Sequence, residues 1–351
     1  MVPRVLRSRP IRPIPVILGP TAVGKTELSL ALAHELDAEI VSADSRQIYR
    51  LLDIGTAKPD AAQRRAVPHH LVDVLGPDQP LNAARFARMA WGCIRAIEAR
   101  GRHALVVGGS GLYLRALTDG LFAGPGANAS VRASLEAEAE THGVDVLHHR
   151  LAAVDPDVAR RIHPHDRVRI VRALEIYMLT GTPISQWQWQ WKQPARARPF
   201  LLIGLMRERE DLQARIAART QAMLTGGLVE EVKTLLAEGY PPTLRPLRSV
   251  GYAEIVAYLA GEYDLARAQE LIERHTWQLA KRQMTWFRRI AQVQWLSLTG
   301  TPEEAILQAA RKLLAHDPSL QEDPSPEVGA ESPWDPCMCF QHLHSRRSHV
   351  E

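Results

Sequence analysis

The eight residues Gly19–Thr26 (GPTAVGKT) match the phosphate-binding pattern G-x-x-x-x-G-K-[ST], which indicates the most specific chemistry in the sequence. The apolar run 14–18 predicts a buried strand before this loop, and residues 27–36 predict a helix after it. In that order, backbone amides of the loop and of the helix N-terminus point at one spot and bind an anion. Lys25 would add a mobile positive charge, and the Thr26 hydroxyl could hold magnesium. The pattern leaves open whether the bound phosphate belongs to a nucleotide.

Asp44 is a second candidate, because it lies at the end of another predicted strand, at residues 38–45 (AEIVSADS). A carboxylate there can act as a general base if a substrate proton comes within hydrogen-bond reach. It can equally cap the following helix or hold magnesium. Its position in the sequence does not decide among these roles.

The segment Gly108-Gly109-Ser110 follows a third predicted strand, at 103–107. Many phosphate-loop NTPases end this strand with an aspartate that helps to hold magnesium. Two glycines stand here instead, so a ligand can approach the backbone closely, and Ser110 offers a hydroxyl. The segment therefore argues against a standard ATPase.

These three candidates must be positioned by the strands before them. Alternating strands and helices predict an α/β fold with a P-loop NTPase-like parallel sheet flanked by helices, in which ligands bind at the carboxyl ends of the strands. A fourth strand is predicted at 200–205, and an amphipathic helix at 81–100. Additional C-terminal helices are predicted at 208–225, 227–238, 251–260 and 264–290.

The strand pattern disappears between residues 120 and 199, where helical segments are bounded by Pro and Gly. We therefore predict a catalytic core at 13–119 and 200–315, and an all-helical insertion domain at 120–199. Residues 1–12 form a basic, Pro-broken lead, and residues 316–351 form a Pro-, Ser- and acid-rich tail. We expect both of these segments to be disordered.

Composition narrows the class of protein. The chain has 351 residues, 46% of them hydrophobic, and no run reaches the roughly 18 apolar residues that span a bilayer. We expect a cytoplasmic monomer without membrane association. Its three cysteines agree with a reducing compartment: Cys93 is predicted to be a packed thiol, and Cys337 and Cys339 either form part of an unstructured tail or bind a metal with nearby histidines.

Arginine dominates the basic residues, since only six of the 43 are lysines and the net charge is +4. Such a chain suits phosphate and nucleic-acid contacts. The helical segment around 167–172 carries three arginines, with Val168, Val171, Ala173 and Leu174 expected on its buried side; it is either an RNA-binding face or a solvated one. Two last sets of candidates remain. Trp187, Trp189 and Trp191 either stack on bases or pack an insertion. The cations Lys281, Arg282 and Arg288 share a helix with two aromatic residues and are predicted to contact nucleic acid, here tRNA if the substrate is one.

Together these motifs resemble the bacterial tRNA dimethylallyltransferases, also called tRNA isopentenyltransferases, over roughly residues 13–300. The matching segments are GPTAVGKT (19–26), SADSRQIY (42–49), DIGTAKP (53–59), PHHLVD (68–73), VVGGSGLY (106–113), HDRVRIVRALEIY (165–177), LRSVGY (247–252) and LAKRQMTWFRR (279–289). The resemblance implies transfer of a dimethylallyl group from dimethylallyl diphosphate to N6 of adenine 37, in tRNAs that read codons beginning with U. It implies Mg²⁺ as cofactor and the anticodon stem-loop as the ligand of the insertion.

The resemblance also assigns residues to these roles. Lys25, Asp44 (as general base) and Ser110, where the family commonly has Thr, become catalytic. Diphosphate binding is implied for Gly19, Pro20, Thr21, Ala22, Val23, Gly24, Lys25 and Thr26, and for Arg215 or Arg219, with Thr26 as the metal ligand. Contacts with tRNA are implied for Asp44, Ser45, Arg46, Gln47, Ser110, Arg132, Val168, Arg169, Ile170, Val171, Arg172, Leu247, Arg248, Ser249, Val250, Gly251 and Tyr252.

Two other functions remain open from the sequence. A small-molecule kinase or phosphotransferase can be built on the same loop, and it would bind ATP. A non-catalytic RNA-binding protein is the second possibility, although the intact Lys25, Thr26, Asp44 and Ser110 argue against it.

Overall fold

A computed structural model describes residues 13–122, 124–189 and 199–315. The described residues divide into two compact units, of which the first contains 13–118 and 199–315 and the second contains 119–122 and 124–189. The second unit thus comes from a single stretch of chain that interrupts the first. The predicted lead, the predicted tail with Cys337 and Cys339, and Trp191 lie outside the described residues.

A six-stranded parallel sheet forms the centre of the first unit, with the strand order β3-β2-β4-β1-β5-β6. The strands are β1 (Ile14–Leu18), β2 (Ala38–Ser42), β3 (His69–His70), β4 (His103–Gly108), β5 (Phe200–Met206) and β6 (Gln294–Ser297). In β1, Val16 pairs with Val106 on one side and Leu202 on the other. Near-continuous apolar runs such as IPVIL form central strands because both faces of a parallel sheet are covered by helices.

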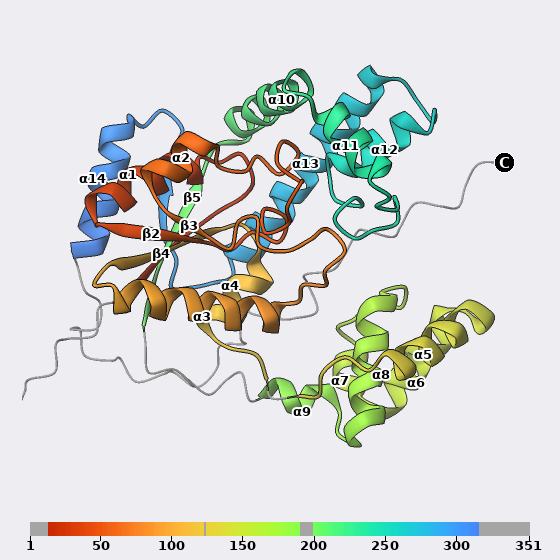
Figure 1. Ribbon diagram of the computed structural model, residues 1–351. Helices are drawn as coiled ribbons and strands as arrows, with labels where there is room; N and C mark the ends of the chain where they lie inside the picture. Colours follow the sequence, from red (N-terminus) through yellow and green to blue (C-terminus); the bar gives the residue numbers. More distant parts are fainter. Residues whose placement is uncertain (1–12, 123, 190–198, 316–351) are drawn as a thin grey trace, which may run out of the picture. The chain divides into compact units, whose positions relative to one another are not determined.

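Helices cover both faces of the sheet. Figure 1 shows α1 (Lys25–Glu35) and α14 (Glu303–Ala315) on one face, and α3 (Ala83–Ala99) and α4 (Gly111–Thr118) on the other. The other helices of this unit are α2 (Ala61–Ala66), α10 (Arg209–Thr225), α11 (Leu228–Ala237), α12 (Tyr252–Leu259) and α13 (Leu265–Phe287). Side-chain caps fix several helix starts: Asn82 accepts a hydrogen bond from the Arg85 amide at α3.

Helices are the only regular secondary structure among the described residues of the second unit. It contains α5 (Ala129–His142), α6 (Val144–Val154), α7 (Pro156–Ala159), α8 (Arg167–Thr180) and α9 (Ile184–Trp189). These helices share an apolar core of their own, which includes Leu147, Leu151, Ile170 and Leu174. The unit therefore buries its hydrophobic surface with side chains from its own helices.

The four predicted strands and the main predicted helices are present, with ends shifted by a few residues. Three elements, β3, β6 and α14, were not predicted from the sequence. Two histidines, a short half-exposed QWLS strand and a helix close to the acidic tail carry weak patterns. None of the described helices combines the length and apolarity that a membrane span requires.

Candidate active site

The Gly19–Thr26 loop connects β1 to α1 and passes close to other backbone. A Cβ on Gly19 would lie 2.8 Å from the carbonyl oxygen of Leu205 in β5, so a larger residue would push these segments apart. Gly24 has φ 111° and occupies the N-cap of α1, a backbone conformation that favours glycine. The predicted order of strand, loop and helix is therefore present, and the free amides of α1 begin at the loop.

Lys25 bends back over the loop that precedes it. Its ammonium donates hydrogen bonds to the carbonyl oxygens of Gly19, at 3.1 Å, and Pro20, at 2.7 Å. Burial lowers the pKa of Lys25 to about 8, against the opposing attraction of Asp44. The charge of Lys25 therefore depends on pH close to neutrality.

Two arginines after β5 hold the carbonyl side of the loop. Arg207 Nε donates to the Val23 carbonyl at 2.8 Å, and Arg215 Nε donates to the Ala22 carbonyl at 2.9 Å. Arg215 also pairs with Glu27 at 3.2 Å. The Nε and one terminal nitrogen of Arg215 are thus engaged within the protein.

Arg219 lies one helical turn further along α10 and is held more loosely. Its guanidinium is 3.3 Å from the Thr21 hydroxyl and 3.5 Å from the Thr56 carbonyl, both long contacts. Burial lowers its pKa, and the attraction of Asp44 partly offsets this effect. The side chain is therefore a cation beside the loop with weak hydrogen bonds.

Asp44 follows β2 and uses only one of its two carboxylate oxygens for structure. Its Oδ1 accepts hydrogen bonds from the amides of Arg46, at 2.7 Å, and Gln47, at 3.3 Å. Within the described part of the chain, Oδ2 makes no hydrogen bond, and Lys25 and Arg219 are close enough to interact with the carboxylate electrostatically. No helix starts in the described residues directly after Asp44, so the helix-capping role considered from the sequence is wrong. Oδ1 instead caps the turn at residues 45–48, and Oδ2 is left for a ligand.

Ser110 joins the Asp44 segment to the end of β4. Its Oγ accepts a hydrogen bond from the Ser45 amide at 3.0 Å, and its own amide donates to the Ala43 carbonyl at 3.3 Å. A Cβ on Gly108 would lie 2.3 Å from the same Ala43 carbonyl oxygen. The glycine therefore permits the close approach of β2 and β4 that brings Ser110 to Asp44.

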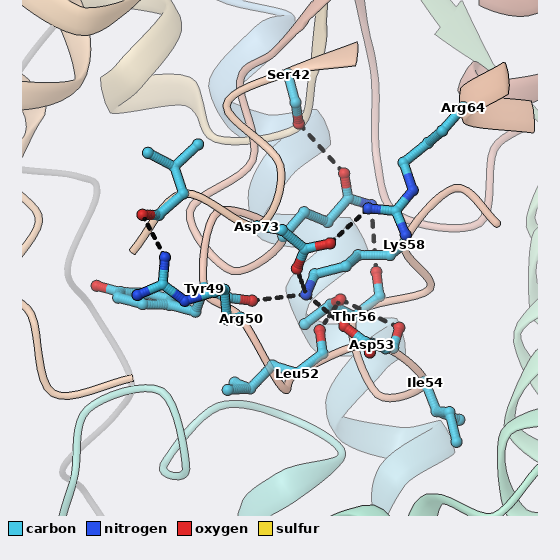
Figure 2. A network of polar contacts seen from close by, with 12 residues as sticks. Ser42, Tyr49, Arg50, Leu52, Asp53, Ile54, Thr56, Lys58, Arg64 and Asp73 are labelled. Atoms are coloured by element: carbon cyan, nitrogen blue, oxygen red, sulfur yellow. Dashed lines mark hydrogen bonds and ion pairs between the residues drawn. The ribbon is translucent and has the colours of Figure 1, made fainter. Parts of the chain in front are cut away.

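The segment after Asp44 is stabilised by a polar network around Lys58 (Figure 2). The Lys58 side chain is 3% exposed, and its ammonium donates to the Tyr49 carbonyl at 2.6 Å and pairs with Asp53 and Asp73. Arg64 binds the second oxygen of Asp73. Burial alone would raise the pKa of Asp73, but the hydrogen bonds from Lys58 and Arg64 lower it overall.

This network lies where the backbone is strained. Of the six non-glycine residues with positive φ in the described part of the chain, four lie beside it: Leu51 (68°), Ala57 (46°), Leu71 (62°) and Asp73 (57°). Such conformations cost energy and persist only where surrounding contacts enforce them. The Lys58 network supplies these contacts.

Two further side chains, Gln47 and Glu231, shape the same segment. Gln47, a predicted tRNA contact, accepts from the Ser42 hydroxyl at 3.2 Å and donates to the Ala57 carbonyl at 3.1 Å. Glu231 on α11 accepts hydrogen bonds from the amides of residues 53–55, at 2.7–3.2 Å, and from the Tyr252 hydroxyl at 2.6 Å. Gln47 and Tyr252 thus have structural contacts of their own within the protein.

The other predicted tRNA contacts of the first unit differ in exposure. Leu247 and Tyr252 are buried, Ser249, Val250 and Arg282 are half-buried, and Arg248, Lys281 and Arg288 are exposed. Gly251 has φ 95°, the left-handed region that favours glycine, and lies at the start of α12. Burial, together with repulsion from Arg245, lowers the pKa of Arg46.

In the second unit, ion pairs already engage the predicted arginines. Arg132 binds Glu175 through two nitrogens, at 2.8 and 2.9 Å, and Arg172 binds the same carboxylate at 2.6 Å. Arg169 is 6% exposed and pairs with Asp166 at 2.9 Å. Glu175 is fully buried, and although burial alone would raise its pKa, its hydrogen bonds lower it overall.

The buried side of α8 differs from the expected one. We expected Val168 on this side, but it is 46% exposed, whereas Ile170 and Val171 are buried in the core with Ala173 and Leu174. The cause is the short N-terminal turn, in which Asp166 caps the helix and pairs with Arg169, so Arg169 turns inward. Ile170 and Val171 therefore hold the helix in place.

The remaining motifs have structural surroundings. Trp187 packs against the core of the second unit, with its ring 6.4 Å from that of Phe122, as the packing interpretation predicted. Cys93 is half-buried in α3, and burial raises its thiol pKa. Among the described residues, no group of three or more His, Cys, Asp or Glu side chains is arranged to hold a metal.

Sequence reasoning did not single out Arg207, Lys58, Glu231 or Gln283 as site residues. Lys58 and Gln283 lie inside quoted motif segments, so their position in DIGTAKP and KRQMTWFRR was the available signal. Arg207 precedes α10 and Glu231 lies within α11; each has charged neighbours in the sequence, and no local pattern reveals its distant partners.

Comparison with known proteins agrees with this geometry. Residues 47–290 match the family model described as IPP transferase, and residues 13–72 match that described as Isopentenyl transferase. A tRNA dimethylallyltransferase of Geobacter metallireducens is 50% identical over 285 residues, which cover 81% of this chain and 92% of the relative.

Solved structures have the same architecture. The tRNA isopentenylpyrophosphate transferase from Bacillus halodurans is 37% identical, with a TM-score of 0.65 over 87% of this chain and 96% of that one. A eukaryotic dimethylallyltransferase acting on tRNA is 27% identical, with a TM-score of 0.72 over 89% of this chain and 81% of that one. The six-stranded parallel sheet with flanking helices is thus shared with these proteins.

The chain therefore belongs to the tRNA dimethylallyltransferase family, as its motifs predicted. It is an enzyme of the prenyltransferase class.

Proposed function

We propose that this enzyme transfers a dimethylallyl group from dimethylallyl diphosphate to N6 of adenine 37, in tRNAs reading codons that begin with U. The observation that carries the proposal is the convergence of three groups at the carboxyl ends of adjacent strands. The Gly19–Thr26 loop follows β1, Asp44 follows β2 and Ser110 follows β4, and these strands are neighbours in the sheet. An anion site and an unoccupied carboxylate oxygen are thereby brought close together.

The diphosphate is proposed to bind a P-loop NTPase-like core at the Gly19–Thr26 loop. Charge leaves with the diphosphate, so amides and cations fixed beside it stabilise the transition state. Of the two candidate arginines, Arg219 is the better supported, because Arg215 is engaged by Ala22 and Glu27. The weak contacts of Arg219 leave its guanidinium able to turn toward phosphate oxygens.

The residues present fit a magnesium ion held mainly by its ligand. Thr26 is half-buried at the start of α1, and its hydroxyl makes no hydrogen bond within the described residues. Mg²⁺ in phosphate sites commonly takes one or two protein oxygens and completes its shell with phosphate and water. Bound there through Thr26, it would neutralise charge on the diphosphate.

The nucleophile needs help, because the lone pair of adenine N6 is delocalised into the ring. We assign Asp44 Oδ2 as the general base that accepts the N6 proton, while Oδ1 stays bound to the amides of Arg46 and Gln47. The Ser110 hydroxyl can donate a hydrogen bond, since its oxygen already accepts one from Ser45. The reacting adenine must leave the base stack to reach these groups.

We propose that the second unit is an insertion domain that binds the anticodon stem-loop. Of the predicted set in this unit, Arg132 and Val168 have the most exposed side chains, at 43% and 46%. Arg248, Lys281 and Arg288 are exposed in the first unit. Cytoplasmic tRNA is the substrate that such cations would meet.

Mass analysis of tRNA digests tests the proposal. Purified protein is incubated with tRNA, Mg²⁺ and either dimethylallyl diphosphate or ATP. We expect one dimethylallyl group on adenine 37 with the prenyl donor and no change with ATP. Unmodified tRNA in the arm with the prenyl donor would contradict the proposal, and modification at another base would contradict the assigned target.

A further inference from the structure

Gln283 on α13 is hydrogen-bonded to both loops of the candidate active site. Its Oε1 accepts from the backbone amide of Thr21 at 2.9 Å, and its Nε2 donates to the carbonyl of Gly109 at 2.9 Å. The backbone N–H of Thr21 can only donate and the carbonyl of Gly109 can only accept. The side-chain amide of Gln283 can therefore bond to both only in this orientation. The half-buried side chain thus bridges the Gly19–Thr26 loop and the Gly108–Ser110 segment.

The loop opposite α13 is built to admit this bridge. A Cβ on Gly109 would lie 2.7 Å from Gln283 Nε2, and a Cβ on Gly111 would lie 2.8 Å from the ring of Trp286. Both glycines therefore allow one face of α13 to approach the end of β4. Gln283 and Trp286 lie three residues apart, as neighbours on a helix face do.

Beyond Gly109, the hydrogen bonds continue to the proposed general base. Ser110 is the next residue, and its Oγ accepts from the amide of Ser45, which is adjacent to Asp44. On the other side, the hydroxyl of Thr21 contacts Arg219. Gln283 is therefore the link between the residues proposed to hold the diphosphate and those proposed to activate the adenine.

We propose that Gln283 is a positioning residue that sets the distance between the bound prenyl donor and the attacking adenine; this rests on the function proposed above. In the transfer, the bond between the allylic carbon and the diphosphate oxygen breaks, and its electron pair leaves with the diphosphate. The N6–carbon bond forms with the nitrogen lone pair, and Asp44 takes the N6 proton. The two halves of this reaction lie on different loops, so a shift of one loop relative to the other lengthens the path of attack.

The test compares Gln283→Met, which keeps the side-chain length but removes both hydrogen bonds, with Gln283→Glu. The Glu variant keeps an acceptor for the Thr21 amide, but it places a second oxygen, which cannot donate, against the Gly109 carbonyl. We expect kcat to fall about 100-fold in the Met variant, as for an ångström-scale misplacement, and to fall in the Glu variant too. The Kd for inorganic diphosphate and for tRNA should stay within about twofold of the wild type, because the binding groups remain.

Gln278→Met is the matched control, since Gln278 is an exposed glutamine on the same helix. It should leave kcat unchanged. The ratio of diphosphate released to adenine modified gives a readout that a loss of folding would not move: it should rise above one in the Gln283 variants, as water replaces the misplaced nucleophile. Thermal unfolding of all three variants reports their stability.

Three outcomes decide the matter. A fall in kcat with retained binding and an excess of diphosphate release supports the proposal. Retained kcat in both Gln283 variants, or a loss of substrate affinity that matches the loss of kcat, overturns it. Failure of the proposed function has a different signature, because the wild-type protein would then modify no tRNA, and both proposals would fall together.

Discussion

The ammonium of Lys25 is the charge at the Gly19–Thr26 loop that pH changes most readily. Its pKa is lowered to about 8, so the side chain is charged below this pH and becomes neutral as pH rises through it. We expect the affinity for inorganic diphosphate to weaken about tenfold per pH unit above that value, as the protonated fraction falls. Calorimetric titration across this range measures the effect.

Lys25→Arg provides the control, because a guanidinium stays protonated throughout this range. Diphosphate itself titrates in this range, and this affects the variant and the wild type equally. The difference between their profiles of affinity against pH therefore reports the protonation of Lys25. Parallel profiles for the two proteins would contradict the assignment.

Arg215 and Arg219 have the same charge and lie on the same helix, but their contacts predict different roles. Arg219→Leu should weaken binding of inorganic diphosphate about 10- to 100-fold, the range for losing hydrogen bonds to a charged group. Arg215→Leu should weaken it less than about threefold, because Arg215 is paired with Glu27. Equilibrium dialysis measures both, and the reverse ranking would exchange the two roles.

At the scale of elements, one buried ammonium, that of Lys58, holds the segment from Asp44 to Asp73, which consists of loops with the short α2 and β3. Lys58→Met removes the hydrogen bonds to the Tyr49 carbonyl and the two aspartates. We expect the free energy of unfolding to fall by about 1–3 kcal/mol, as for polar groups left unsatisfied. Urea denaturation measures the change.

Lys233→Met is the control for this prediction. Lys233 pairs with Glu230 at 2.8 Å on α11, but both side chains are more than half exposed, at 52% and 72%. Such a surface pair contributes little, so we expect a change below about 0.5 kcal/mol. Equal losses in the two variants would show that the Lys58 network has no special role.

The strand ends could be predicted from the sequence because their signals are local. An apolar run followed by GPTAVGKT, or by Asp44 or Gly108, specifies a strand and what comes after it. The bridges made by Gln283 and Glu231 could not be predicted, since each joins residues more than 170 positions apart. Gln283 lies in a cationic helix whose composition suggested nucleic acid, and only the fold reveals its two partners.

The inward turn of Arg169 was unpredictable for a related reason. Periodicity put Val168 on the buried side of α8, but the Asp166 cap and its ion pair determine the local orientation. Charged residues near a helix start can thus outweigh an apolar pattern a few residues long.

At the scale of the whole molecule, we propose that both units contact one tRNA. Arg132→Ala in the second unit and Arg288→Ala in the first should each weaken tRNA binding and lower the salt dependence of log K by about one. Arg95→Ala, at an exposed arginine of α3 with no proposed tRNA contact, should change neither. Filter binding at several salt concentrations gives the slopes.

An unchanged salt dependence in the Arg132 variant would show that Arg132 makes no phosphate contact and serves only its ion pair with Glu175. An unchanged slope in the Arg288 variant would instead limit the tRNA contacts of α13 to its other cations. The two variants together therefore report whether each unit contributes a phosphate contact.

The central claim is that Asp44 activates the adenine while the Gly19–Thr26 loop holds the diphosphate. Single-turnover transfer by Asp44→Asn tests it most directly, because Asn keeps an oxygen for the amides of Arg46 and Gln47 but is a very weak base. We expect transfer to slow by about 100-fold or more, with tRNA affinity almost unchanged and diphosphate affinity not reduced. Transfer at a near wild-type rate would contradict the account.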